Sequence, residues 1–108
     1  MICINNEVPE LVTGPGVKRK ILATGGGMMT VQFTFDRGSI GALHSHPHEQ
    51  IGFVVKGKFE FTLEGKASIL DVGDSYYVPS GAVHGAKALE DGILLDVFTP
   101  QREDFLPR

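Results

Sequence analysis

Residues 38–57 read GSIGALHSHPHEQIGFVVKG and carry three of the chain's four histidines, at positions 44, 46 and 48. Because successive side chains of a β-strand point to opposite faces, His44 and His46 would share one face. Pro47 cannot donate a ladder hydrogen bond, so a strand should end or turn there, and the returning chain could bring Gln50 back beside His46. This stretch is therefore either an exposed polar loop or one half of a metal site.

The rest of the chain is patterned as short β-strands. In TVQFTF (residues 30–35) and KFEFTL (residues 58–63), apolar and polar side chains alternate with the period of two that is typical of strands with one buried face. Glycine-containing turns separate such runs, and no segment shows a sustained helical stripe. The pattern predicts an all-β sandwich or barrel, with helix limited to a turn in the tail QREDFLPR (residues 101–108).

Composition and charge limit the classes of function. A chain of 108 residues, 42% hydrophobic and 21% charged, is typical of one globular domain, and its formal net charge of -3 suggests no nucleic-acid partner. The single cysteine, Cys3, excludes an internal disulfide and any C-x-x-C motif. The opening MICINNEVPE lacks the basic start and apolar run of a secretory signal, and no apolar run approaches the ~20 residues of a membrane span. We expect a cytoplasmic protein without a membrane partner, whose basic triplet (residues 18–20) is solvated surface.

A fourth histidine, His84, lies well downstream in VPSGAVHGAKA (residues 78–88), after a Pro-Ser-Gly turn. If two hairpins face one another, His44, His46 and His84 could converge on one divalent cation. Imidazole nitrogens bind such ions at ~2.0–2.1 Å, and they suit zinc as well as the first-row series from manganese to copper. An isolated histidine is more often a surface or hydrogen-bonded residue, and His48 taken alone favours that interpretation.

The spacing of these residues resembles the two motifs of the cupin superfamily. The first motif, G-x5-H-x-H-x3,4-E-x6-G, matches residues 38–57, and the second, G-x5-P-x-G-x2-H-x3-N, matches residues 73–88. The resemblance implies a single cupin domain over residues 1–108, folded as a jelly-roll barrel (a double-stranded β-helix) with little helix.

Two positions depart from the cupin pattern. Gln50 occupies the glutamate position of the first motif, unless Glu49 takes its place through a shifted loop, and Ala88 replaces the asparagine of the second. With Gln50 as a ligand, three neutral imidazoles and a neutral amide would cancel none of the ion's double charge. Such an ion is a stronger Lewis acid and attracts anionic substrates more strongly. Whether Glu49 or His48 joins the ligands stays open.

Within this superfamily the chain resembles the single-domain pectin-degradation cupins of the KdgF type. The similarity rests on HSHPHEQIGFVVKGKFEF (residues 44–61), GDSYYVPSGAVHGAKALEDGILLDVFTPQREDFL (residues 73–106) and the lead-in FDRGSIG (residues 35–41). KdgF proteins convert the 4,5-unsaturated monouronates left by pectin and alginate lyases to a linear, ketonised form. The resemblance implies an anionic sugar substrate and one divalent transition metal ion (Zn, Ni, Mn, Fe or Co). It implies His44, His46, Gln50 and His84 as metal ligands, and Asp96, Phe98 and Arg102 as residues of the substrate pocket.

The segment GILLDVF (residues 92–98) bears on the predicted role of Asp96. Leu94, Asp96 and Phe98 share one face of this strand. Burying a carboxylate in so apolar a segment is costly unless it has a hydrogen-bonding partner or a catalytic role. Asp96 is either a proton shuttle near the metal or a hydrogen-bond partner of the backbone or of a lysine.

Other polar residues have two interpretations as well. Arg102 either clamps a uronate carboxylate or forms a surface ion pair with Glu103 or Asp104. Residues that could contact sugar hydroxyls in the pocket are Gln32 and either Tyr76 or Tyr77.

The opposite face of residues 92–98 is also apolar. Ile93, Leu95 and Val97 form a strip that predicts an interface, and we expect a homodimer. Two other functions stay open beside the uronate-converting enzyme. One is an iron(II) cupin dioxygenase acting on a small organic substrate, although Cys3 lies far from both motifs. The other is a metal- or sugar-binding cupin without turnover.

Overall fold

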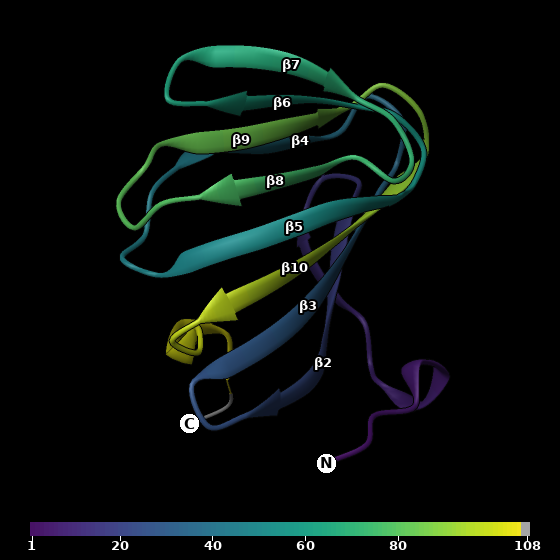
Figure 1. The fold of residues 1–108 in the computed structure, drawn as a ribbon. Helices are drawn as coiled ribbons and strands as arrows, with labels where there is room; N and C mark the ends of the chain where they lie inside the picture. Colours follow the sequence, from purple (N-terminus) through teal and green to yellow (C-terminus); the bar gives the residue numbers. More distant parts are fainter. Residues whose placement is uncertain (107–108) are drawn as a thin grey trace.

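The computed structural model describes residues 1–106, which fold almost entirely into antiparallel β-structure (Figure 1). These residues form ten strands and two single-turn 3-10 helices. The first half contains η1 (Asn5–Glu7), β1 (Leu11–Gly14), β2 (Val17–Gly25), β3 (Met28–Phe35), β4 (Ile40–His44) and β5 (Glu49–Lys56). The second half contains β6 (Phe59–Leu63), β7 (Lys66–Leu70), β8 (Ser75–Val78), β9 (His84–Ala88), β10 (Gly92–Thr99) and η2 (Glu103–Phe105). The prediction of an all-β fold with little helix is confirmed.

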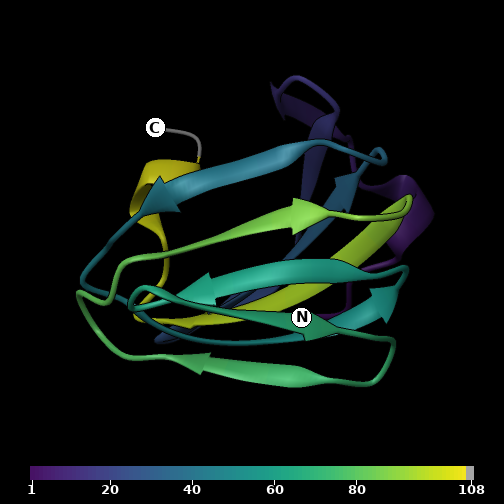
Figure 2. The same ribbon diagram turned by 90° about the horizontal axis from the view of Figure 1, so that it is seen from above.

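Two sheets pack against each other to form the jelly roll. One sheet has six strands in the order β1-β2-β3-β10-β5-β8, and the other has four in the order β4-β9-β6-β7. From β3 onward the chain passes repeatedly from one sheet to the other, which closes the two layers around a common interior (Figures 1 and 2). β10 lies between β3 and β5, so both of its edges are paired.

The period-two alternation of the sequence sets which side chains fill the interior. Along β10 the residues Leu94, Asp96 and Phe98 are buried, as their shared face predicts. Aromatic pairs fill much of the core: Phe35 meets Phe59 edge to face at 5.2 Å between ring centroids, and Phe61 stacks on Tyr76 at 3.9 Å. The members of this cluster are Val17, Phe35, Val54, Phe59, Phe61, Tyr76, Val78, Ala88 and Leu94.

The two cupin-like motifs, residues 38–57 and 73–88, each contribute a loop to the same end of the molecule. Figures 1 and 2 show the β4–β5 loop, the β8–β9 turn and η2 together there. η2 is the helical turn predicted in the tail, whose last two residues lie outside the described part of the chain. η1 was not predicted. Among residues 1–106, no helix has the length and apolar character needed to cross a bilayer.

Candidate metal centre and substrate cavity

Three histidines converge where the two sheets meet. His44 ends β4 and is paired in register with His84, the first residue of β9, while His46 lies in the β4–β5 loop. The ring centroids of His44 and His84 are 4.4 Å apart, and that of His46 lies 4.9 Å from His84. One ligand atom from each ring lies within 4.8 Å of the other two. The two motifs therefore bring together three groups that could hold one metal ion.

The three rings share the same backbone contact, in which Nδ1 lies at hydrogen-bond distance from a carbonyl oxygen. These distances are 2.9 Å from His44 to Ala42, 3.1 Å from His46 to His48 and 3.0 Å from His84 to Ala82. When Nδ1–H donates in a neutral imidazole, Nε2 keeps a free lone pair. Contacts of this kind orient the histidine ligands of metal sites. The backbone thus prepares all three rings to bind through Nε2.

The β4–β5 loop is held by the turn that precedes His84. The Gly81 amide donates to the His46 carbonyl oxygen over 2.8 Å, and the Ser80 hydroxyl donates to the Pro47 carbonyl oxygen over 2.6 Å. Gly81 has φ +80, a left-handed conformation that favours glycine, so the motif glycine is needed for this turn. The turn thereby fixes His46 relative to the β8–β9 connection.

Gln50, the first inward residue of β5, faces the histidines with its amide oxygen. Its Nε2 donates to Asp96 Oδ1 over 2.9 Å, which directs Oε1 toward His46 Nε2, 3.0 Å away. Burial lowers the pKa of His46 to about 4, so the ring is neutral at pH 7 and has one proton for two acceptors, Gln50 Oε1 and the His48 carbonyl. When Nδ1 carries that proton, the lone pairs of Nε2 and Oε1 face each other. A cation between them satisfies both, so these residues fit a divalent transition metal.

Asp96 lies beside this group, at the centre of the six-stranded sheet. Its side chain is 3% exposed, and Oδ1 accepts hydrogen bonds from the Tyr76 hydroxyl at 2.7 Å and from Gln50 Nε2 at 2.9 Å. Burial raises the pKa of Asp96 to about 6, while the two hydrogen bonds oppose the rise. Among residues 1–106 its side chain bonds neither lysine nor backbone, which were the simpler predicted partners. Two donors on one oxygen leave the other oxygen available to a ligand.

Gly52 makes the contact between Asp96 and Tyr76 possible. It lies on β5 opposite Asp96 of β10 on one side and Tyr76 of β8 on the other. A Cβ atom at this position would overlap Asp96 Oδ1 and the Tyr76 hydroxyl. This role of Gly52 was not predicted, although a glycine inside the apolar run of residues 51–55 signals close approach of a neighbouring side chain or backbone.

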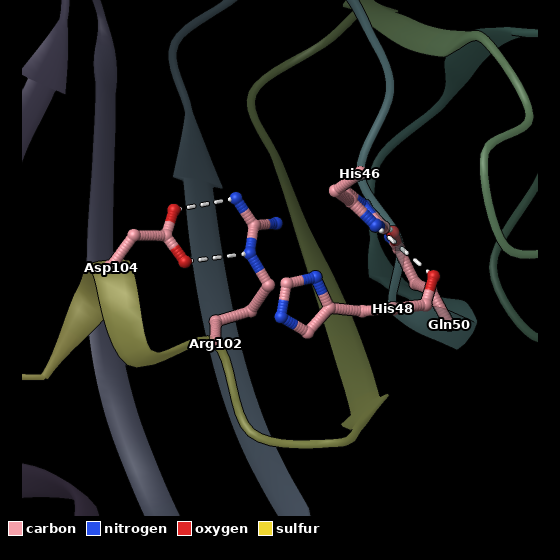
Figure 3. Close-up of polar contacts among 5 residues, drawn as sticks. All are labelled: His46, His48, Gln50, Arg102 and Asp104. Carbon is pink, nitrogen blue, oxygen red and sulfur yellow. Dashed lines mark hydrogen bonds and ion pairs between the residues drawn. The ribbon is translucent and has the colours of Figure 1, made fainter.

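Arg102 reaches the same cavity from the segment between β10 and η2. The residue is 8% exposed, and its guanidinium lies 5.2 Å from the Phe98 ring centroid and 4.2 Å from that of Phe105. Asp104 accepts two hydrogen bonds from it, from Nε at 3.0 Å and from Nη2 at 2.8 Å (Figure 3). The predicted ion pair with Asp104 is therefore present, but its arginine is buried rather than on the surface.

Arg19 corrects the interpretation of the basic triplet. Instead of lying in a solvated patch, its guanidinium stacks 3.9 Å from the centroid of the Phe105 ring. Arg19 is opposite Phe33 in the β2–β3 register and shares the inner face of β2 with Val17, which explains its contact with η2. Phe105 is thereby in contact with two guanidinium groups, Arg19 and Arg102.

A cavity of about 450 Å³ joins these groups, a size typical of small-molecule sites. The polar residues that line it include His44, Gln50, His84, Asp96 and Arg102, and aromatic walls include Phe98 and Phe105. Metal donors, a carboxylate and a guanidinium therefore share one space with apolar walls.

Three other predicted contacts lie elsewhere. Gln32 is not at the cavity: its side chain accepts a hydrogen bond from Asn5 at 2.8 Å, because it sits on the face of β3 opposite the inward Val31. Tyr77 is exposed and donates to Glu49 over 2.7 Å, so Glu49 points outward while Gln50 is buried.

His48 is the other residue that was considered as an additional metal ligand. It is half-buried, and its ring centroid lies 5.4 Å from that of His46, but it is not one of the three clustered histidines. Figure 3 shows it on the side of the site where Arg102 lies. Tyr76, one of the two tyrosines considered, is the one that faces inward.

Comparison with known proteins agrees with this architecture. The family model described as "Cupin domain" matches residues 31–98. The chain belongs to the cupin family. This cupin is 42% identical over 105 residues to the pectin degradation protein KdgF of Dickeya dadantii, a match that covers 95% of this chain and 96% of that protein.

Solved structures are also similar to this cupin. KdgF from Halomonas sp. is 44% identical with a TM-score of 0.94, and the match covers 98% of each chain. An RmlC-like cupin from Shewanella frigidimarina is 37% identical with the same TM-score, over 97% of this chain and 95% of the other. The likeness to proteins named KdgF therefore extends over nearly the whole chain.

Proposed function

We propose that this cupin is a metal-dependent enzyme that opens the ring of a 4,5-unsaturated monouronate and converts the product to its linear keto form. The observation that carries the proposal is one cavity lined by two of the three clustered histidines, His44 and His84, together with Asp96 and Arg102. The similarity to two proteins named KdgF, one of them a pectin degradation protein, supports the choice of substrate.

We assign the metal to His44, His46, His84 and the amide oxygen of Gln50. A bound divalent ion (Zn, Ni, Mn, Fe or Co) would act as a Lewis acid on a sugar oxygen. Because the four donors are neutral, they leave the charge of the ion available to an anionic ligand. The hydrogen bond from Gln50 Nε2 to Asp96 then ties the donor set to the proton-transferring group.

Asp96 is our candidate for moving the proton. Opening the cyclic hemiacetal removes the proton of the anomeric hydroxyl and breaks the bond from that carbon to the ring oxygen. Ketonisation then places a proton on the carbon at the far end of the enol. A buried carboxylate whose pKa is raised to about 6 is suited to accept and return a proton near neutral pH. Arg102 would hold the uronate carboxylate, and Phe98 would form a wall of the pocket.

The test follows the absorbance of the conjugated double bond of unsaturated galacturonate. The metal-loaded protein should accelerate its loss over the spontaneous rate, and protein treated with a chelator should not. Asp96→Asn should bind metal normally and lose turnover. Absence of acceleration by the metal-loaded protein would exclude this enzyme. Oxygen uptake by the iron-loaded protein would then favour the dioxygenase, and sugar binding without turnover would favour a binding protein.

We also propose that this cupin forms a homodimer through the outer face of its six-stranded sheet. On β5 the outward residues Ile51, Phe53 and Val55 are 58%, 40% and 42% exposed. They adjoin the outward side chains of β10, since Leu95 is paired with Phe53 and Val97 with Ile51. A continuous apolar face over two central strands is typical of a protein interface.

A further inference from the structure

The ion pair between Arg102 and Asp104 occupies only one edge of the guanidinium. Asp104 accepts from Nε and Nη2, which together form the side of the planar group. Neither bond uses Nη1. Figure 3 shows this third nitrogen directed away from Asp104, toward the side on which His46 lies. The end of the guanidinium, with Nη1 and the second hydrogen of Nη2, is therefore available for another bidentate acceptor.

Three groups together hold Arg102 in this orientation. Asp104 fixes the plane of the guanidinium from the side, and the rings of Phe98 and Phe105 contact it at 5.2 and 4.2 Å. The side chain of Arg102 is 10% exposed, whereas that of Asp104 is 56% exposed. The aspartate therefore lies on the solvent side of the pair, and the arginine lies on the cavity side.

The position of Arg102 relative to the metal donors makes this orientation useful. Arg102 lines the same cavity as His44 and His84. A small anion in the cavity would therefore have the metal donors on one side and the free edge of a guanidinium on another. Carboxylates match such an edge with two parallel hydrogen bonds.

We propose that Asp104 is a positioning residue, which holds Arg102 by its Nε–Nη2 side so that the end formed by Nη1 and Nη2 receives the carboxylate of a sugar acid bound in the cavity. The inference rests on the proposed function, since it assumes that Arg102 meets the substrate carboxylate. A long arginine that is already ordered loses less conformational freedom when the ligand binds. Asp104 therefore increases affinity for anionic sugars without touching them.

The experiment compares Asp104→Asn with Glu103→Gln in the metal-loaded, full-length protein. Both changes remove one negative charge from η2, but only Asp104 bonds Arg102. Calorimetry with galacturonate as the probe, and galactose as its uncharged counterpart, measures the preference for the carboxylate. Asp104→Asn should weaken galacturonate binding roughly 3- to 10-fold and leave galactose binding unchanged. Glu103→Gln should change neither.

The direction of the change in galacturonate affinity distinguishes a positioning role for Asp104 from competition between Asp104 and the ligand for Arg102. If Asp104 merely blocked Arg102, its loss would tighten galacturonate binding, and unchanged or tighter binding in Asp104→Asn overturns the proposal. In turnover, KM should rise while kcat is nearly kept. Asp104→Glu retains the charge and should recover part of the affinity; failure to exceed Asp104→Asn counts against the proposal.

Arg102→Gln distinguishes a failure of this inference from a failure of the proposed function. Loss of the preference for galacturonate in this variant shows that Arg102 meets the carboxylate, whether or not the protein turns over unsaturated uronates. An unchanged preference in Arg102→Gln overturns the role of Asp104 as well.

Discussion

Asp96 and Tyr76 are hydrogen-bonded to each other across Gly52, although the whole of β5 lies between their strands. The Tyr76 hydroxyl donates to Asp96 Oδ1 over 2.7 Å, and both residues are opposite Gly52 in the strand register. Burial raises the pKa of Tyr76 well above its ordinary value, so the phenol stays protonated and remains a donor. Because Gly52 has no side chain, Tyr76 can reach across it and hold the carboxylate of Asp96, the candidate proton-transferring group.

Gly52→Ala should separate Asp96 from Tyr76. The new Cβ would overlap both partners, and the forced shift should cost about 1–3 kcal/mol of unfolding free energy. Urea denaturation measures this cost, and turnover should fall with it. Gly25→Ala is the matched control, because that strand glycine has open space around its Cβ position. Equal stability of the two variants would show that the gap at Gly52 is not required.

The three clustered histidines should hold the metal, and His48 should not. His84→Ala should lose bound metal, as measured by elemental analysis, whereas His48→Ala should retain it. Metal present at about 100 times its Kd should add about 2.7 kcal/mol to the stability of the wild type. Thermal unfolding with and without chelator tests this difference. Equal metal loss in the two variants would contradict the assignment.

The stability of the metal-free protein should depend on the ionisation of Asp96. Burial raises its pKa from 3.8 to about 6, so the folded state holds this proton more tightly than the unfolded state. The resulting stability is complete below about pH 4 and is lost as the pH rises through about 6.

Asp96→Asn cannot ionise and should gain about 2–3 kcal/mol relative to the wild type between about pH 4 and pH 7. Urea unfolding of both chelator-treated proteins at the two pH values measures the gain. The same difference between the proteins at both values would mean that burial does not perturb this carboxyl.

Charge on the outer face of β5 should dissociate the proposed dimer. Ile51→Lys places an ammonium group in the apolar face, so light scattering should report a monomer. Leu43→Lys is the control, since Leu43 is 62% exposed on the other sheet and Ile51 is 58% exposed. A wild type that is already monomeric, or a dimer that persists in Ile51→Lys, would be evidence against this interface.

The strands and the pairing of His44 with His46 could be predicted because both depend on local spacing, whereas the approach of His84 depends on the register of β9 with β4. Alternation in residues 30–35 and 58–63 marks strands that the structure places at β3 and β6. The spacing from His44 through His46 to Gln50 fits a strand, a turn and a returning strand. Each of these residues reaches its place mainly through the conformation of its own segment.

The alternation of side chains along a strand does not show which of its two faces points inward when both faces carry polar and apolar residues. On β3, the inward face carries Val31 and Phe33, and Gln32 therefore points away from the cavity. The same ambiguity applied to the adjacent residues Tyr76 and Tyr77. The pairing of β8 with β5 places Tyr76 on the inward face.

The sequence by itself determined the all-β fold and the shared face of Leu94, Asp96 and Phe98, and it was sufficient to propose four candidate metal donors. The tertiary structure alone decided that Asp96 meets Tyr76 over Gly52, and that Arg19 and Arg102 contact the same aromatic ring. Hydrophobic periodicity is a property of a single segment, so it can be recognised directly in the order of its residues. Contacts between strands that are distant in the chain depend on sheet order and register, which arise only when the whole core packs.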